Sequence, residues 1–181
     1  MRISISGLPG AGTTTVSKKL AKKLNYKHID VGQIFRQAAL EHKMSLFDFE
    51  NYVLKHLEED RKIDQRVMDY ARENKDIILE GRLTGWMTKR NKIPCFKVWF
   101  SAPKKIRAER IAQREKISFP EALKDINLRE AAIRQRYKNC YKIDIDDLSI
   151  YDLRVDSARK TPEEIVNLIL DKIKNGSNKD F

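Results

Sequence analysis

Three glycines and three threonines near the start of the chain form a pattern that suits the binding of phosphate. Gly7, Gly10 and Gly12 precede residues 13–15, which are all threonine. Such glycines let the backbone curl until its N–H groups point inward at an anion. The spacing matches G-x-x-x-x-G-K-[ST], except that threonine replaces the lysine, and the next threonine keeps the hydroxyl that would bind Mg²⁺. The pattern predicts a nucleotide site made of Gly7, Leu8, Pro9, Gly10, Ala11, Gly12, Thr13, Thr14 and Thr15.

Arginines form a second group, and several of them follow predicted strands. A guanidinium binds two phosphate oxygens at once and stays charged. Phosphoryl transfer asks a protein mainly to position the reactants and to neutralise charge. The combination therefore predicts a kinase that acts on a phosphorylated acceptor, with Arg107 left open between a functional and a surface role. The group comprises Arg36, Arg82, Arg107, Arg110, Arg114, Arg129 and Arg136.

Two acids stand where they could serve the same chemistry. Glu80 closes an apolar strand, a position from which a carboxylate can hold Mg²⁺ through water. Asp30 is expected beside the loop at the mouth of the site. Either acid could instead be a helix cap or a loop residue. The histidines show no pairing with a nucleophile, and Trp86 is expected to pack rather than to stack on a base.

The elements that must position these residues alternate between strand and helix. Short apolar strands are predicted at residues 3–6, 27–29, 76–80, 95–100 and 153–155, with helices between them. This order predicts an α/β fold, a five-stranded parallel sheet with helices on both faces. Ligands gather at the carboxyl ends of such strands. Gly7, Asp30, Glu80 and Ser101 are all expected at that edge.

Composition bounds the class of protein and its partners. The 181 residues suit one domain, and the formal charge of +11 suits an anionic partner, either nucleic acid or nucleotide phosphate. Cys95 and Cys140 are too few for a disulfide framework or a zinc site. No apolar run approaches the roughly 20 residues that would span a bilayer. Because the start leads directly into the first strand, we expect no signal peptide and a cytoplasmic location.

Taken together, these segments resemble the cytidylate kinases of the P-loop superfamily, most closely the archaeal type. The resemblance covers about residues 1–172 and includes threonine at the lysine position of the loop. Residues 30–36 read Asp-Val-Gly-x-x-Phe-Arg, and residues 79–87 read Leu-Glu-Gly-Arg-Leu-x-Gly-Trp-Met, similar to the two acceptor segments of nucleoside monophosphate kinases. Residues 107–114 look like the start of a lid. Residues 128–130, 136–138 and 145–152 are similar to the archaeal type in particular.

The resemblance implies ATP as donor, Mg²⁺ as cofactor and CMP or dCMP as acceptor. It also implies one P-loop kinase domain over residues 1–181, with an acceptor-binding helical insertion at about 32–75 and a lid at about 110–141. We expect a monomer with no stable nucleic-acid partner and no membrane association. The implied acceptor-site residues are Asp30, Gly32, Arg36, Gly81, Arg82, Arg129 and Arg136, and Arg110 and Arg114 would join Arg129 and Arg136 over the transferred group.

Two departures from the family pattern leave questions open. Thr13 removes a positive charge from the loop, so other arginines must neutralise more of the phosphate charge. Ile133 stands where relatives tend to carry an acid that helps to read the cytosine amino group, which leaves UMP or another monophosphate possible as acceptor. A kinase for a small unphosphorylated metabolite is an alternative. So is a basic nucleic-acid-binding module, although aromatics are only 8% and do not interleave with the basic runs.

Overall fold

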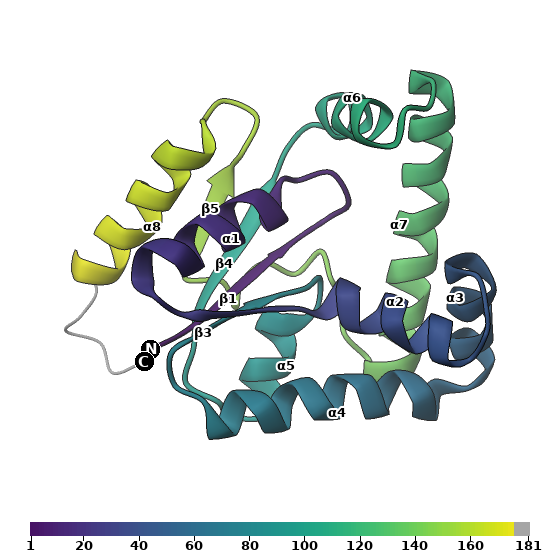
Figure 1. The fold of residues 1–181 in the computed structure, drawn as a ribbon, viewed down its shortest axis with the longest axis horizontal. Coiled ribbons are helices and arrows are strands. Elements are labelled where there is room, and N and C mark those ends of the chain that lie inside the picture. The colour runs from purple at the N-terminus through teal and green to yellow at the C-terminus, as the bar shows by residue number, and fades with distance from the viewer. Residues whose placement is uncertain (176–181) are drawn as a thin grey trace.

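A computed structural model describes residues 1–175, apart from the side chains of residues 46 and 47. Its centre is one parallel sheet of five strands in the order β2-β3-β1-β4-β5 (Figure 1). The predicted α/β fold is confirmed. Apolar residues fill the central strands because both faces of the sheet are covered. The strands are β1 (Arg2–Gly7), β2 (Lys27–Asp30), β3 (Ile77–Glu80), β4 (Phe96–Ser101) and β5 (Leu153–Asp156).

Helices cover both faces and extend beyond one end of the sheet (Figure 1). On one face α1 and α8 pack against the sheet, and on the other α4, α5 and the end of α7 form a second core. The α2 and α3 helices add a small apolar cluster of their own. The helices of the described residues are α1 (Thr13–Leu24), α2 (Val31–Glu41), α3 (Leu46–Lys55), α4 (Leu57–Glu73), α5 (Thr84–Arg90), α6 (Lys104–Glu115), α7 (Phe119–Tyr141) and α8 (Pro162–Asn175).

Local side-chain caps mark the starts of several helices. The Asp30 side chain accepts a hydrogen bond from the backbone N–H of Gln33 at 3.0 Å and begins α2. Ser118 and Glu121 form a reciprocal capping box at α7. Such caps stabilise a helix by about 1 kcal/mol. The helix-cap role considered for Asp30 is confirmed.

No single sequence signal marks the short helix α5, which lies between β3 and β4. It contains Gly85, a weak helix former, and only seven residues. The glycine is required by packing, because a Cβ at that position would lie 2.6 Å from the ring of Tyr151. Tertiary contact therefore explains this helix better than propensity does.

The register brings the predicted site residues to one edge of the sheet. Glu80 pairs with Asp30 on one side and with Ile5 on the other, and Gly7 pairs with Phe100. The expectation that Gly7, Asp30, Glu80 and Ser101 share the carboxyl edge is confirmed. Within the described residues, no helix has both the length and the apolar character needed to cross a membrane.

Candidate active site

The loop between β1 and α1 has the geometry of an anion site. Gly10 and Gly12 adopt φ of 82° and 85°, which a side chain would disfavour. A Cβ on Gly10 would also lie 2.7 Å from the carbonyl oxygen of Arg107, so the loop packs directly on α6. Gly12 caps α1 without a side-chain hydrogen bond, and no acid occupies the first turn. The N–H groups and positive dipole end of α1 are thus left for an anion.

Glu80 organises the polar side of this loop. Its Oε1 accepts hydrogen bonds from the hydroxyls of Thr13 at 2.9 Å and Thr14 at 2.5 Å. Its Oε2 lies 2.8 Å from Nε2 of His28. Burial acts to raise the pKa of Glu80, but the hydrogen bonds from His28, Thr14 and Thr13 outweigh it and lower the pKa. The carboxylate is therefore held ionised beside the loop.

This donor set fits Mg²⁺. A hydroxyl and a carboxylate are oxygen ligands of the kind that a hard cation prefers. In the described part of the chain, no three His, Cys, Asp or Glu residues gather into a metal cluster. Mg²⁺ commonly uses one or two protein oxygens and completes its shell with water and substrate phosphates. Thr14 and Glu80 match that sparse arrangement.

Two arginines of α6 hold the loop by its carbonyl groups. Arg107 donates to the carbonyl oxygens of Pro9 and Ala102, both at 3.0 Å, and forms an ion pair with Glu130 at 2.6 Å. It is 5% exposed, so the surface role considered for Arg107 is wrong. Arg110 donates to Gly10 at 3.4 Å. The loop is thereby fixed to α6 before any ligand arrives.

Ser157, just beyond β5, completes this support. Its hydroxyl donates to the carbonyl oxygen of Ala11 at 2.7 Å, and its own carbonyl accepts from Arg110 at 2.7 Å. The side chain is buried. Ser157 thus joins the loop, α6 and the edge of the sheet.

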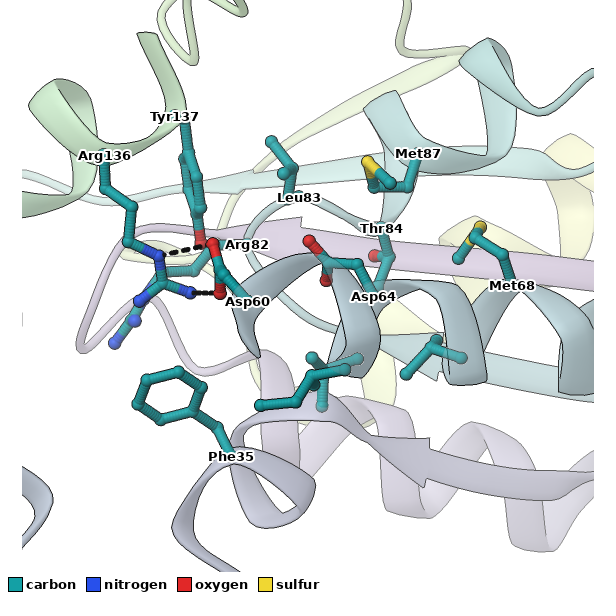
Figure 2. Close-up of a pocket in the computed structure, with 13 residues that line it drawn as sticks. Phe35, Asp60, Asp64, Met68, Arg82, Leu83, Thr84, Met87, Arg136 and Tyr137 are labelled. Carbon is teal, nitrogen blue, oxygen red and sulfur yellow. Dashed lines mark hydrogen bonds and ion pairs between the residues drawn. The ribbon is translucent and has the colours of Figure 1, made fainter. Parts of the chain in front are cut away.

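On the other side of Glu80, α2, α4, the start of α5 and α7 enclose a cavity (Figure 2). Its polar groups lie among apolar side chains. Arg136 of α7 forms a two-pronged ion pair with the buried Asp60 of α4, at 2.9 and 2.5 Å. The Arg136 guanidinium also lies 4.8 Å from the ring centre of Phe35. The lining residues are Val31, Phe35, Asp60, Ile63, Asp64, Val67, Met68, Arg82, Leu83, Thr84, Met87, Arg136 and Tyr137.

Arg82 is the most unusual charge in this cavity. It is half-buried, and among the described residues no acceptor forms a hydrogen bond or an ion pair with it. Burial lowers the pKa of Arg82, and the positive charges of Arg136 and Arg129 act in the same direction. The positive charges of the three arginines therefore repel one another, and an anion bound among them would be stabilised.

The remaining predicted residues are less closely gathered. Arg36 is exposed, lies 3.4 Å from Asp30 and covers Gly32, where a Cβ would touch the guanidinium. Arg129 pairs with Asp125 at 2.9 Å. Gly81 follows β3 directly and donates its backbone N–H to the carbonyl oxygen of Ile5, which fixes Arg82 beside the sheet. Arg114 is exposed, forms an ion pair with Glu115 and makes no contact with the loop.

Sequence reasoning missed four residues that the structure places in this region. His28 was judged ordinary because its partner Glu80 lies 52 positions away. Asp60 and Asp64 were hidden among the many charges of α4, although their i, i+4 spacing puts them on one face. No sequence motif pointed to Ser157. Ile133, whose identity raised the question of base preference, is buried in the core.

A family model described as the cytidylate kinase-like family matches residues 2–159. The chain is 46% identical to the cytidylate kinase of Methanocaldococcus jannaschii over 176 residues, which covers 97% of this chain and 98% of that protein.

The chain belongs to the cytidylate kinase-like family.

A second member of this family, the cytidylate kinase of Pyrococcus abyssi, is 47% identical over 167 residues, covering 92% of this chain and 90% of that protein. The predicted resemblance is confirmed. The cytidylate kinase-like fold also matches a solved shikimate kinase from Aquifex aeolicus with a TM-score of 0.62, 20% identity and 98% coverage of both chains. At that identity the likeness supports the kinase fold alone. The two cytidylate kinases and the family model do not favour a nucleic-acid-binding module or a metabolite kinase.

Proposed function

We propose that the protein transfers the γ-phosphoryl group of ATP to CMP or dCMP and gives the diphosphate. The observation that carries this proposal is Arg82, a half-buried guanidinium without a partner among the described residues. It follows β3, the strand beside the one that ends in the phosphate loop. A neutral acceptor would leave this charge uncompensated, whereas a monophosphate would neutralise it. We further propose that the protein acts as a monomer in the cytoplasm.

On the donor side, the loop from Gly7 to Thr15 would hold the phosphates with its backbone N–H groups. Thr14 and Glu80 would hold Mg²⁺, Glu80 through water. When bound, Mg²⁺ would neutralise charge that develops on the donor phosphates. The hydrogen bond from Thr14 to Glu80 turns a lone pair of the Thr14 hydroxyl away from the carboxylate, where it is free for this ligation.

On the acceptor side, Arg36 and Arg82 would hold the monophosphate. Asp30 restrains Arg36 at 3.4 Å, and Gly32 leaves room for its guanidinium. No general base is needed, because a phosphate is already an anionic nucleophile at neutral pH. The task of these residues is to align its oxygen with the donor.

The lid would comprise α6 and the first part of α7. Ala108, Ile111, Ala122 and Ile126 form a small cluster that joins these two helices. The end of α7 belongs instead to the main core, through Ile133 and Tyr137. Closure over the nucleotides would bring Arg110, Arg114 and Arg129 toward the transferring group, which Arg136 would meet from the cavity, and keep water out.

A coupled assay of ADP formation tests the proposal, with AMP, CMP, dCMP, UMP and GMP as acceptors. We expect the highest kcat/KM with CMP and dCMP, and dependence on Mg²⁺. ATP consumption with none of the acceptors, or a preference for AMP, would overturn the assignment. ATP consumption that is equal with and without acceptor would indicate hydrolysis instead.

A further inference from the structure

The peptide between Pro9 and Gly10 in the phosphate loop is held from outside by α6. Arg107 donates a hydrogen bond to the Pro9 carbonyl oxygen at 3.0 Å. In a trans peptide the C=O and the following N–H point in opposite directions, and the described residues contain no cis peptide bond. The Gly10 N–H is therefore directed away from the Arg107 guanidinium, and no described residue accepts a hydrogen bond from it. One side-chain contact thus sets the direction of a donor that the loop offers to an anion.

Ser157 holds a second peptide of the loop in the same manner. Its hydroxyl donates to the Ala11 carbonyl oxygen at 2.7 Å, which directs the Gly12 N–H to the opposite side. Gly10 and Gly12 both have positive φ, a conformation that other residues rarely adopt. The two holding side chains come from different elements, since Arg107 lies on α6 and Ser157 follows β5. The directions of the two N–H groups are thus set separately.

Arg107 is itself held by Glu130 of α7. Its Nη1, the atom that donates to Pro9, lies 2.6 Å from Glu130 Oε1, and both side chains are buried. Among the described residues, Arg107 is the partner of that oxygen. Burial acts to raise the pKa of Glu130, but Arg107 and Arg134 outweigh it and lower the pKa, so the carboxylate stays ionised. A buried guanidinium without this carboxylate would carry an uncompensated charge.

Glu130 belongs to residues 128–130, one of the segments that resemble the archaeal type, and the proposed function uses only Arg129 of that segment. The other carboxylate oxygen of Glu130, Oε2, lies 3.3 Å from Arg134 and 3.6 Å from Lys104. These two contacts leave Oε1 to Arg107. The arrangement gives Glu130 a task at the phosphate loop, although it lies on a different helix from the one that contacts the loop.

Resting on the proposed function, we propose that Glu130 is a positioning residue for the donor phosphates. Through Arg107 it fixes the Pro9 carbonyl, so that the Gly10 N–H faces the bound phosphate. Glu130 itself touches neither nucleotide. With a neutral side chain at this position, the guanidinium loses its compensating charge and no longer holds the Pro9 carbonyl in one direction. The peptide then turns, because glycine tolerates many backbone conformations, whereas the Gly12 N–H keeps its direction.

Glycine-selective ¹⁵N labelling of the full chain tests this directly, because the sequence contains only seven glycines. ADP is added without Mg²⁺ and without CMP, so neither the metal nor the acceptor contributes. In the wild type, the amide protons of Gly10 and Gly12 should both move downfield as they bond to phosphate. In Glu130→Gln, the Gly10 shift should be largely lost while the Gly12 shift is kept. Calorimetry should show a Kd for ADP that is about tenfold higher.

A double variant separates positioning from folding, because Glu130→Gln also leaves a buried charge unpaired. Arg107→Met combined with Glu130→Met replaces the ion pair by apolar side chains of similar size, which should restore the urea midpoint toward that of the wild type. No donor then reaches the Pro9 carbonyl, so ADP binding should stay weak and the Gly10 shift small. Recovery of ADP binding together with stability would show that the ion pair only stabilises the fold, and it would overturn the proposal.

Glu109→Gln is the matched control, because Glu109 is exposed on α6 two positions from Arg107. It should leave the ADP affinity, the Gly10 shift and the urea midpoint unchanged. A Glu130→Gln variant that binds ADP as the wild type does, with an unchanged Gly10 shift, overturns the role of Glu130 while the kinase assignment stands. A wild type that binds no ADP overturns the proposed function instead.

Discussion

The loop between β1 and α1, proposed for the donor, and the cavity around Arg82, proposed for the acceptor, differ in how much of their charge is already paired. Around the loop, Glu80 takes three hydrogen bonds and Arg107 and Arg110 hold loop carbonyls. The groups left for a ligand are the backbone N–H groups of the loop and of the first turn of α1. In the cavity, Arg82 lacks a partner among the described residues and Asp64 keeps an open oxygen. The proposed donor site is thus held in place before a ligand binds, whereas the proposed acceptor site carries charge that a ligand would neutralise.

The largest effect is expected from Arg82→Met. Removing a charged contact to a transferring phosphate lowers kcat/KM by about 100- to 1000-fold. The free energy of unfolding should stay level or rise, because the arginine is half-buried without a partner. Steady-state kinetics with CMP and urea unfolding measure the two effects. Lys62→Gln, exposed on α4, serves as a matched loss of charge. A clear loss of stability in Arg82→Met would contradict the contrast between the two regions.

Glu80→Gln should show the reverse pattern in stability. An amide cannot satisfy the Thr13, Thr14 and His28 groups as the carboxylate does, so unfolding should become easier by about 1–3 kcal/mol. Activity should fall about 10- to 100-fold, with a higher Mg²⁺ requirement. Magnesium titrations and urea unfolding measure this, with exposed Glu73→Gln as the control. A variant as stable as the wild type would show that the loop is not braced by Glu80.

The pH dependence of stability should expose the charge left in the cavity. Burial, together with the nearby Asp60, raises the pKa of Asp64 to about 6 from an ordinary 3.8. Since the folded form holds the proton more tightly than the unfolded form, this carboxyl destabilises the fold above about pH 6 and the penalty is relieved as pH falls through 6. The shift corresponds to at most about 3 kcal/mol.

Urea unfolding of the wild type and Asp64→Asn at pH 7 and pH 5 checks this sign. The wild type should gain stability relative to the variant at the lower pH. The difference isolates Asp64 from other groups, including Glu80, whose lowered pKa acts in the opposite sense. A difference that does not change between the two pH values would contradict the prediction.

The smallest effect is expected from Ser157→Ala. The variant loses the buried hydrogen bond to Ala11, which contributes about 1 kcal/mol. The KM for ATP should rise a few-fold while the KM for CMP stays unchanged, because only the donor loop loses support. Ser101→Ala, exposed at the same edge of the sheet, is the control. Equal changes in the KM for ATP and the KM for CMP would contradict the proposed division between the donor loop and the Arg82 cavity.

Sequence reasoning reached the loop and Arg82 because both depend on local order. A glycine-rich turn after an apolar strand is recognisable from neighbouring residues, and Arg82 follows its strand directly. It did not reach the Asp60–Arg136 pair, whose partners are 76 positions apart. Nor did it separate Arg107, which is buried against the loop, from Arg114, which is exposed. Spacing on a helix predicts a shared face but not what lies opposite that face.

The sequence by itself determined the parallel sheet, the phosphate loop and which charges follow which strands. Those features arise from alternation of apolar residues and from backbone conformations that only glycine adopts readily. Only the tertiary structure decided which charges are paired and which are left open, as Arg82 and the Asp64 Oδ1 are. Pairing depends on distances of a few ångströms between elements far apart in the chain, and those distances exist only after the cores have packed.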